Sequence, residues 1–329
     1  MELLILGDRA RYERYMPAFV KELDLKITFL PVDASTREIA EAAPGTQVIL
    51  ADAIRKVDGE LMDALPNLKL VHSDGVGYNG MDVDAARERG IYVCNCKGCN
   101  ADAVAEVAVM LMLMVTRLAM PGYRAMMEDR QMEYKEHVMR SGVPEFADHS
   151  VGIIGLGDIA KATVRRLAPF GNQIFYYTPH RRSEEEEQEL GVTYLPLEEV
   201  VERCDIVSLH CAANAQTVGM VDESFLKRMK PGSYLINVSR GQLVDNLAVR
   251  DALLSGHLAG AGFDTLWPEP TPASHPLIQL PQEVRDRVAY LPHLGGNTGP
   301  AFQRAYTVMW ENVRRLLREE RLVNVVNKI

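Results

Sequence analysis

Cysteine and positive charge are both scarce in this sequence. Five cysteines in 329 residues are an odd number, and too few for a disulfide-stabilised secreted scaffold. Basic side chains number 36 against 45 acidic ones, which gives a formal net charge of −9. Binding to nucleic acid requires clustered Lys and Arg that neutralise phosphates, and no basic tract occurs here. Nucleic acid is therefore not an expected partner.

The sequence also lacks an uninterrupted apolar run long enough to cross a membrane. Its most apolar stretch, residues 101–120, contains three charged side chains, so we interpret it as a largely buried helix. The first residues carry no basic segment, and Gly7 and Asp8 interrupt their apolar run. This start is expected to be a first strand and not a signal peptide. We expect a cytoplasmic protein without a membrane partner.

The remaining composition is that of a folded α/β protein. Hydrophobic residues make up 47% and charged residues 25%, and the length suffices for two or three domains. Apolar runs alternate with amphipathic segments, which predicts parallel sheets covered on both faces. Helices are expected over residues 11–23, 101–120 and 299–320, among others. The expected strands are residues 3–6, 27–30, 47–50, 68–72, 91–94, 151–154, 174–177, 192–195, 206–209, 234–238, 261–264 and 288–291.

Residues 151–160 carry the pattern of a dinucleotide-binding turn. Gly155 and Gly157, with Ala160 in third place, match G-x-G-x-x-G/A between an apolar strand and a helix. Gly155 permits the tight turn, Gly157 lets a pyrophosphate approach the backbone, and Ala160 allows close helix packing. The helix N-terminus then offers its amides to the phosphates. The alternative interpretation is a glycine turn of purely structural use.

The end of the next strand bears on the choice between NAD and NADP. NAD enzymes usually place Asp or Glu there, but this chain has Thr178, followed by His180, Arg181 and Arg182. Arg can bind a ribose 2′-phosphate bidentately, whereas a carboxylate would repel it. We therefore expect NADP as the cofactor, with NAD as the alternative. The other interpretation is that the two arginines only pair with the acidic run 184–187 at a solvated helix start.

Three later strands end in charged side chains. Arg240 follows one strand, Asp264 and Glu269 follow a second, and His293 follows a third. The carboxyl ends of strands in a doubly wound sheet face the ligand, so these groups are expected to converge near the cofactor. The alternatives are a surface ion pair for Arg240, a core position for His293 and a turn position for Glu269.

These motifs, in this order, make the chain resemble the D-isomer-specific 2-hydroxyacid dehydrogenases over nearly its whole length. Segment 178–182 makes it most similar, within that family, to the NADP-preferring glyoxylate/hydroxypyruvate reductases. The chain departs from the family at Cys96 and Lys97, where Thr-Pro is usual. The resemblance rests on Gly75-Val76-Gly77, Asn100 with Val104-Ala105-Glu106, turn 155–160, Met229-Lys230-Pro231-Gly232, Arg240-Gly241 with Val244-Asp245, Glu269-Pro270 and Pro292-His293.

The resemblance implies a fold and an activity. A Rossmann cofactor domain, residues 100–296, would be inserted in a flavodoxin-like substrate domain made of residues 1–99 and 297–329. Closure about the junctions would exclude water. The implied reaction is NADPH-dependent reduction of a small 2-keto acid, of the glyoxylate or hydroxypyruvate type, to the D-2-hydroxy acid. A homodimer through the cofactor domain is also implied, with segment 121–148 as the exchange element.

The resemblance further implies roles for single residues. Arg240 would bind the substrate carboxylate and polarise the ketone, His293 would be the general acid for reduction, and Glu269 would hydrogen-bond and orient His293. Asp264 would meet the nicotinamide carboxamide. Further substrate contacts are expected from Val76, Gly77 and Asn100. Cofactor contacts are expected from Gly155, Leu156, Gly157, Asp158, Ile159, Thr178, His180, Arg181, Arg182, His210, Cys211, Ala212, Thr217, Val238, Ser239, Asp264 and Gly295.

Several alternatives stay open at this point. Cys94, Cys96 and Cys99 form a C-x-C-x-x-C pattern, but no fourth ligand lies nearby in the sequence, so no metal is expected. Redox sensitivity and plain packing are the other interpretations of these thiols. The same fold also serves non-catalytic, dinucleotide-sensing corepressors. Reductases of bulkier 2-keto acids are a further alternative, whereas formate dehydrogenase is disfavoured because it carries Gln where Glu269 stands.

Overall fold

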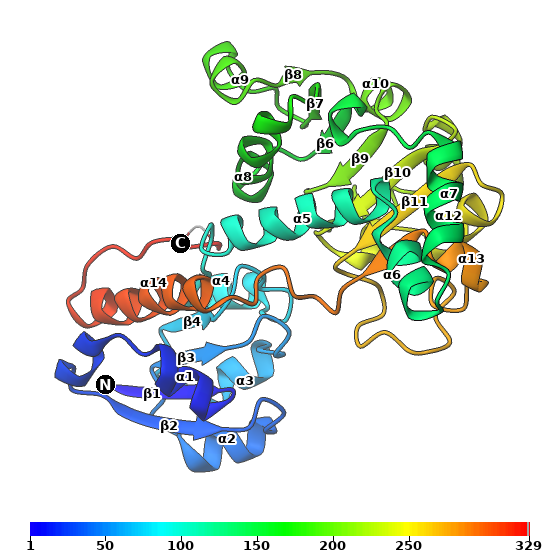
Figure 1. Cartoon of the computed structure of the whole chain (residues 1–329). Helices are drawn as coiled ribbons and strands as arrows, with labels where there is room; N and C mark the ends of the chain where they lie inside the picture. Colours follow the sequence, from blue (N-terminus) through cyan, green and yellow to red (C-terminus); the bar gives the residue numbers. More distant parts are fainter. Residues whose placement is uncertain (328) are drawn as a thin grey trace. The chain divides into compact units, whose positions relative to one another are not determined.

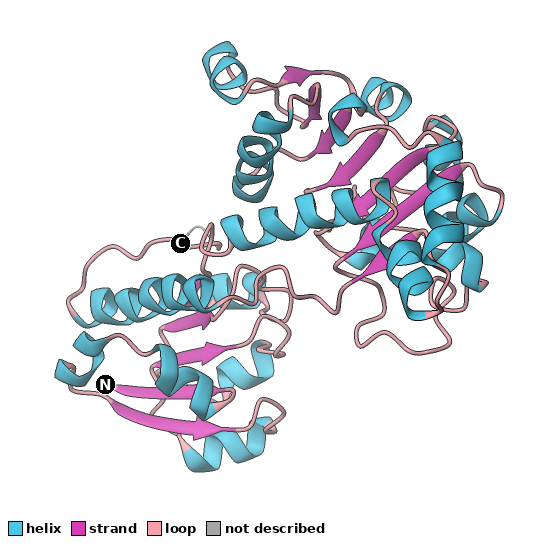
Figure 2. Ribbon diagram, viewed as in Figure 1, coloured by secondary structure: helices cyan, strands magenta, loops and turns pink. Residues whose placement is uncertain are grey.

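The computed structural model describes residues 1–327 and 329, which divide into two α/β units (Figure 1). The first unit contains Met1–Asn100 and Asn297–Ile329, and the second contains Ala101–Gly296. Each unit has its own sheet, drawn in magenta in Figure 2, and all strand pairs in both sheets are parallel. The predicted doubly wound α/β class is confirmed.

The first unit is a sheet with helices on both faces. Alternate residues of its first strand enter different cores: Leu3 and Ile5 pack with α14, whereas Leu4 and Leu6 pack with α2 and α3. The strands are β1 (Glu2–Leu6), β2 (Lys26–Leu30), β3 (Val48–Ala51), β4 (Leu70–Ser73) and β5 (Tyr92–Cys94), in the order β2-β1-β3-β4-β5. The helices are α1 (Arg9–Tyr15), α2 (Thr36–Ala42), α3 (Gly59–Asp63), α4 (Val83–Glu88) and α14 (Gly299–Leu317).

The expected helix over residues 11–23 is shorter in the structure. The helix α1 ends at Tyr15, and a separate 3-10 turn covers Ala18–Glu22. Pro17 lies between them, and a proline pushes the preceding residue out of the helical region, as the ψ of 121° at Met16 shows. The proline therefore divides a segment whose apolar pattern alone predicted one helix.

The second unit is a seven-stranded sheet whose order reverses between β6 and β9, the arrangement of a Rossmann fold. Its strands are β6 (Val151–Ile154), β7 (Ile174–Tyr177), β8 (Thr193–Tyr194), β9 (Ile206–Leu209), β10 (Ser233–Asn237), β11 (Leu258–Phe263) and β12 (Val288–Tyr290), in the order β12-β11-β10-β9-β6-β7-β8. Its helices are α5 (Ala101–Thr116), α6 (Ala119–Met127), α7 (Gln131–Ser141), α8 (Asp158–Leu167), α9 (Glu184–Leu190), α10 (Leu197–Arg203), α11 (Glu223–Arg228), α12 (Asn246–Leu254) and α13 (Gln282–Arg285).

The apolar stretch after residue 100 forms α5, which packs on β10, β11 and α8 (Figure 1). In the described part of the chain, no single helix is long and apolar enough to cross a membrane. The pair α5 and α6, which is bent by 64°, passes that test by length and composition alone. Segment 121–148, which the resemblance implied to be the exchange element, is largely helical, in α6 and α7.

A buried polar network ties the C-terminal segment to the first sheet. His72 in β4 is fully buried, and its Nε2 accepts a hydrogen bond from Asn312 Nδ2 at 3.0 Å. Its Nδ1 therefore carries the hydrogen and donates to the Ser73 carbonyl oxygen at 2.7 Å. Asn312 also exchanges two bonds of 2.9 Å with the backbone of Val323. The network requires an uncharged imidazole.

We expect this imidazole to make the fold sensitive to acid. Burial lowers the pKa of His72 to about 4, so between about pH 6.5 and pH 4 the unfolded chain binds a proton that the folded chain rejects. The free energy of unfolding should thus be highest above pH 6.5 and fall by about 3 kcal/mol as the pH drops through this interval. Urea unfolding of His72→Gln at several pH values should show a shallower fall than the wild type. Exposed His137→Ala is the control, and an unaltered slope in His72→Gln would contradict the assignment.

Candidate active site

The turn after β6 has the geometry that a dinucleotide phosphate needs. Gly155 has a φ of 94°, and a Cβ there would lie 2.8 Å from the Cys211 amide nitrogen, so no other residue fits without strain. Gly157 precedes α8, and no described atom lies within 4 Å of where its Cβ would be. Ala160 is fully buried against the sheet. The turn thus offers open space beside the backbone at a helix N-terminus, and its residues fit a dinucleotide.

The segment after β7 gives its two arginines different partners. Arg181 donates from Nε and Nη2 to the two carboxylate oxygens of Glu187, both at 2.8 Å. Arg182 instead donates from Nη2 to the carbonyl oxygen of Leu156, in the phosphate turn, at 3.1 Å. Thr178 is buried, and its hydroxyl donates to the His180 carbonyl oxygen at 2.6 Å. Pairing with the acidic run therefore holds for Arg181 and not for Arg182.

The acidic run 184–187 was expected to be a solvated helix start, and this expectation is wrong for Glu187. It is buried, and the Tyr176 hydroxyl also donates to it, at 2.6 Å. The hydrogen bonds from Arg181 lower the pKa of Glu187 to about 2, so the carboxylate stays charged and neutralises that guanidinium. The sequence shows four similar glutamates here, and only the helical phase places one of them inward.

The three residues expected to carry the chemistry come together in the second unit. His293 Nδ1 lies 2.8 Å from Glu269 Oε1 and 3.1 Å from Oε2. Arg240 interacts electrostatically with the same carboxylate. Burial lowers the pKa of Arg240, and the negative charge of Glu269 opposes that shift. The three residues follow β10, β11 and β12, which are neighbours in the sheet. An imidazole paired with a carboxylate beside a guanidinium can donate a proton near a bound anion.

Asp264 holds the loop that carries His293. It is 2% exposed, and its two oxygens accept the amides of Leu294 at 2.7 Å and Gly295 at 2.9 Å. Its carbonyl oxygen accepts the His293 amide at 2.8 Å. A Cβ on Gly295 would come within 2.7 Å of the carboxylate, which explains the glycine. Both carboxylate oxygens are thus bonded to the loop, and the expected contact with the nicotinamide carboxamide stays a prediction.

Asn237, which was not expected to matter, positions the loop of Arg240. Its Nδ2 donates to the Arg240 carbonyl oxygen at 2.9 Å, and its Oδ1 accepts the Ser239 amide at 3.0 Å. Next to it, a Cβ on Gly241 would lie 2.3 Å from the carbonyl carbon of Leu266, so this glycine lets the Arg240 and Glu269 loops touch. The available signal for Asn237 in the sequence was its position three residues before Arg240, at the end of a predicted strand.

Two side chains contact the Trp267 carbonyl oxygen and hold the segment that leads to Glu269. This oxygen accepts from Asn246 Nδ2 at 2.8 Å and faces His275 Nε2 at 3.1 Å. His275 is 2% exposed. Nothing in the local sequence singled out His275, because its partner lies eight residues away in an irregular loop.

The other expected cofactor residues lie along the carboxyl edge of β6, β9 and β10. His210 Nε2 lies 2.9 Å from Ser208 Oγ, and burial lowers the pKa of His210 to about 4. Ser239 Oγ donates to the Cys211 carbonyl oxygen, which joins the loops after β9 and β10. Leu156 lies in the phosphate turn, Asp158 and Ile159 lie in the first turn of α8, Ala212 and Thr217 follow β9, and Val238 follows β10.

The expected substrate residues of the first unit lie on a braced loop. The Val76 carbonyl oxygen accepts Asn95 Nδ2 at 2.6 Å, and the Gly77 carbonyl oxygen accepts Ser73 Oγ at 2.6 Å. Within the described residues, the amides of Val76 and Gly77 find no acceptor. Asn100 is the last residue of the first chain segment of this unit. Its Oδ1 is buried without a hydrogen-bond partner among the described side chains and backbone. Two adjacent free amides are a suitable anion contact.

The cysteine cluster is packed into the first unit. Cys96 Sγ lies 3.4 Å from the carbonyl oxygens of Ser73 and Ala305, either of which can accept its one hydrogen, and Cys94 is fully buried. Burial raises the pKa of Cys94 to about 12. Across residues 1–327 and 329, no three His, Cys, Asp or Glu side chains are grouped to hold a metal ion.

The Rossmann unit, its phosphate turn and the Arg240–Glu269–His293 cluster together define a dinucleotide-dependent oxidoreductase. Residues 109–295 match the model of the D-isomer specific 2-hydroxyacid dehydrogenase family, NAD binding domain. The chain belongs to this family, as the sequence predicted. It is therefore a dehydrogenase of small 2-hydroxy and 2-keto acids that uses a nicotinamide dinucleotide.

Individual relatives agree with this assignment. The glyoxylate reductase of Thermofilum pendens is 36% identical over 273 residues, covering 83% of this chain and 79% of that protein. The D-3-phosphoglycerate dehydrogenase of Mycobacterium tuberculosis is 34% identical over 316 residues, covering 96% of this chain and 58% of that protein. The structure of D-mandelate dehydrogenase from Rhodotorula graminis superposes with a TM-score of 0.84 at 26% identity, covering 100% of this chain and 98% of that one.

Proposed function

We propose that the chain reduces a small 2-keto acid, of the glyoxylate or hydroxypyruvate type, to the D-2-hydroxy acid, with NADPH preferred and His293 as the proton donor. The observation that carries this proposal is the 2.8 Å contact between His293 Nδ1 and Glu269 Oε1 beside Arg240. The similarity to glyoxylate reductases supports the substrate class.

The proposed roles follow from hydrogen-bond chemistry. The phosphate turn and the N-terminus of α8 would hold the dinucleotide, which supplies the hydride when bound. Arg240 would bind the substrate carboxylate and polarise the keto group, aided by the amides of Val76 and Gly77. Because Glu269 accepts the hydrogen on His293 Nδ1, the proton given to the new hydroxyl comes from Nε2. Glu269 also favours the charged imidazolium that gives up this proton.

The function is tested by following dinucleotide oxidation against glyoxylate, hydroxypyruvate, phenylpyruvate and a branched 2-keto acid. We expect kcat/KM to be highest with the two small acids, and higher with NADPH than with NADH. Fastest turnover of phenylpyruvate would instead support the reductase of bulkier acids. Turnover of none of them, with dinucleotide binding retained, would support the non-catalytic sensing module.

The cofactor preference has its own test, because Arg182 bonds to the phosphate turn whereas its neighbour Arg181 bonds to Glu187. We expect Arg182→Ala to raise the KM for NADPH about tenfold, while the KM for NADH stays within about twofold, since only NADPH carries the 2′-phosphate. Arg181→Ala is the matched control, because its guanidinium is already paired with Glu187. Equal effects of Arg182→Ala on both cofactors would contradict the NADP assignment.

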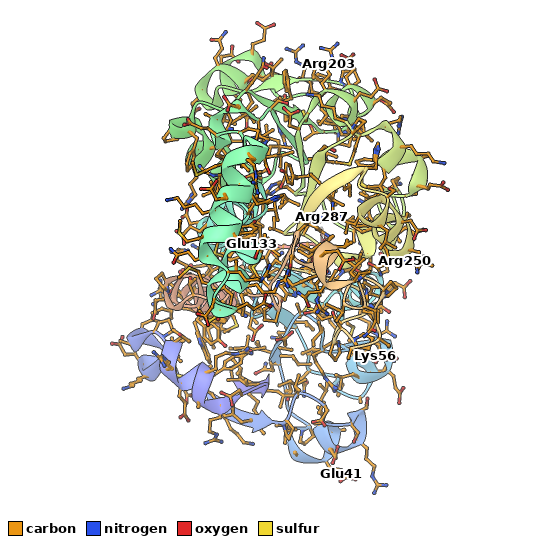
Figure 3. The ribbon with its side chains drawn as sticks, turned by 45° about the vertical axis from the view of Figure 1, so that its right-hand side comes forward. Glu41, Lys56, Glu133, Arg203, Arg250 and Arg287 are labelled. Carbon is orange, nitrogen blue, oxygen red and sulfur yellow. The ribbon has the colours of Figure 1, made fainter. Side chains whose placement is uncertain are left out.

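We also propose a homodimer formed through the second unit. An apolar groove of about 560 Å³ lies between α5, α6 and Phe170. All 11 residues of α7 are at least partly exposed, including Met132 at 61%, Met139 at 65% and the Glu133 labelled in Figure 3. A methionine-rich exposed face of this kind is typical of an interface. Light scattering should give twice the chain mass, and Met132→Glu with Met139→Glu should reduce it to that of the monomer.

A further inference from the structure

We propose that Arg11, Asp52 and Asp74 form a polar site in the first unit that selects a substrate with an uncharged hydroxyl on its tail and rejects a phosphorylated one. This inference rests on the proposed function and specifies its substrate more narrowly: hydroxypyruvate is preferred both to a 2-keto acid with an apolar tail and to 3-phosphohydroxypyruvate.

The position of these residues in the sheet points to a ligand. The strand order β2-β1-β3-β4-β5 changes direction between β1 and β3, and ligands of such sheets bind outside the carboxyl ends of the strands at that point. Arg11 lies in α1 just after β1, Asp52 directly follows β3, and Asp74 directly follows β4. The substrate loop with Val76 and Gly77 begins at the same strand end. The polar site and the proposed carboxylate contacts therefore share one edge of one sheet.

The contacts in this site balance one cation against two carboxylates. Arg11 Nη2 lies 2.6 Å from Asp74 Oδ2 and 4.0 Å from Asp52 Oδ2. The Tyr12 hydroxyl also donates to Asp74, at 3.2 Å. Burial raises the pKa of Asp74 to about 6, against the opposing charge of Arg11, so at pH 7 the carboxylate is mostly ionised. Asp74 is buried, whereas Arg11 and Asp52 keep about a third of their side-chain surface exposed.

This charge balance favours a hydroxyl over a phosphate. A hydroxyl group can accept from the guanidinium and donate to a carboxylate, so it can use both kinds of partner. A phosphate ester carries a charge of about −2 at neutral pH and would face two carboxylates. Arg55, three residues after Asp52, already has a partner, because its Nη2 donates to the Ala34 carbonyl oxygen at 2.6 Å. Like-charge contact is therefore the expected cause of rejection.

The Arg11–Asp52–Asp74 site distinguishes between two activities found among the relatives. Glyoxylate reductases and D-3-phosphoglycerate dehydrogenases match this chain with similar identity, 36% and 34%. Overall similarity therefore does not separate a phosphorylated from an unphosphorylated substrate. The net negative charge of the Arg11–Asp52–Asp74 site separates the two, because it favours the unphosphorylated substrate.

The wild-type enzyme is tested with four substrates: glyoxylate, hydroxypyruvate, 3-phosphohydroxypyruvate, and 2-ketobutyrate, in which a methyl group replaces the hydroxyl. We expect kcat/KM for hydroxypyruvate to exceed that for 2-ketobutyrate about tenfold, because a site that hydrogen-bonds a hydroxyl rejects the analogue lacking it. We expect it to exceed that for 3-phosphohydroxypyruvate about 100-fold. Equal values for the phosphorylated and unphosphorylated acids would overturn the inference.

Two variants test the residues themselves, each normalised to glyoxylate, which has no tail. Asp52→Asn keeps the size of the side chain and removes one negative charge, so the ratio for 3-phosphohydroxypyruvate should rise about tenfold. Glu60→Gln, an exposed charge removal on α3, should leave this ratio unchanged. Arg11→Met should abolish the preference for hydroxypyruvate over 2-ketobutyrate. Unaltered ratios in Asp52→Asn and Arg11→Met would overturn this inference alone, whereas loss of turnover of every 2-keto acid by the wild type would overturn the proposed function as well.

Discussion

Replacing His293 with alanine is expected to lower kcat for 2-keto acid reduction by about 1,000-fold, which is the usual size of a general-acid contribution. The physical reason is that the new alkoxide needs a proton as the hydride arrives, and water is a poorly positioned donor. Glu269→Gln should lower kcat by about 10- to 100-fold, since the amide still contacts the imidazole but no longer stabilises its charged form. Steady-state kinetics with saturating NADPH and glyoxylate measure both effects.

The control for this experiment is His257→Ala, which removes a histidine of the same unit that follows α12, outside the candidate site and the proposed dimer face. It should retain the wild-type kcat. The dissociation constant for NADPH, from fluorescence titration, should change less than about threefold in His293→Ala if the phosphate turn is intact. A wild-type kcat in His293→Ala would exclude His293 as the proton donor.

Replacing Arg240 with methionine is expected to lower kcat/KM by about 1,000-fold. Loss of one partner of a buried, hydrogen-bonded charge pair costs about 2–5 kcal/mol, and here the lost partner would be that of the substrate carboxylate. Arg240→Lys should recover only part of this loss, because a lysine cannot form the same two-pronged contact. Both KM and kcat are expected to change, since Arg240 would contact the carboxylate and the keto oxygen.

Arg250→Ala is the matched control, because Arg250 is in the same unit, on α12, and pairs only with its neighbour Asp251 among the described residues (Figure 3). Thermal unfolding of Arg240→Met should stay close to that of the wild type, which separates a lost contact from a lost fold. If Arg240→Met raised KM without any change in kcat, Arg240 would bind the carboxylate but would not polarise the ketone.

Most of the fold was predictable because its signals are local. The apolar runs of β6 and β9 are buried at every position, so their sequences predict strands with little ambiguity. The turn at Gly155 was predictable too, because a φ of 94° leaves few residues that can occupy it. The end of α1 was less predictable. The apolar pattern of this segment continues past Pro17, and only the backbone geometry shows that the helix stops before this proline.

The candidate site was predictable in its members and less so in their contacts. Arg240, Glu269 and His293 each follow a strand in a recognisable motif, and the parallel sheet brings neighbouring strand ends together. The hydrogen bonds that hold the loops of these three residues in place were not predictable. The expected contact of Asp264 with the nicotinamide carboxamide stays a prediction, and nothing in the sequence indicated that its carboxylate accepts two loop amides 30 and 31 residues further along the chain.

The sequence by itself determined the α/β class, the position of the phosphate turn and the family, because each depends on periodicity or on residues close together in the chain. Only the tertiary structure decided which partner each charged side chain takes. Arg181 and Arg182 are adjacent, yet one pairs with Glu187 in the next helix and the other reaches Leu156, 26 residues away. Hydrogen-bond partners depend on strand order and helical phase, so the distribution of charge at the site emerges only from the folded chain.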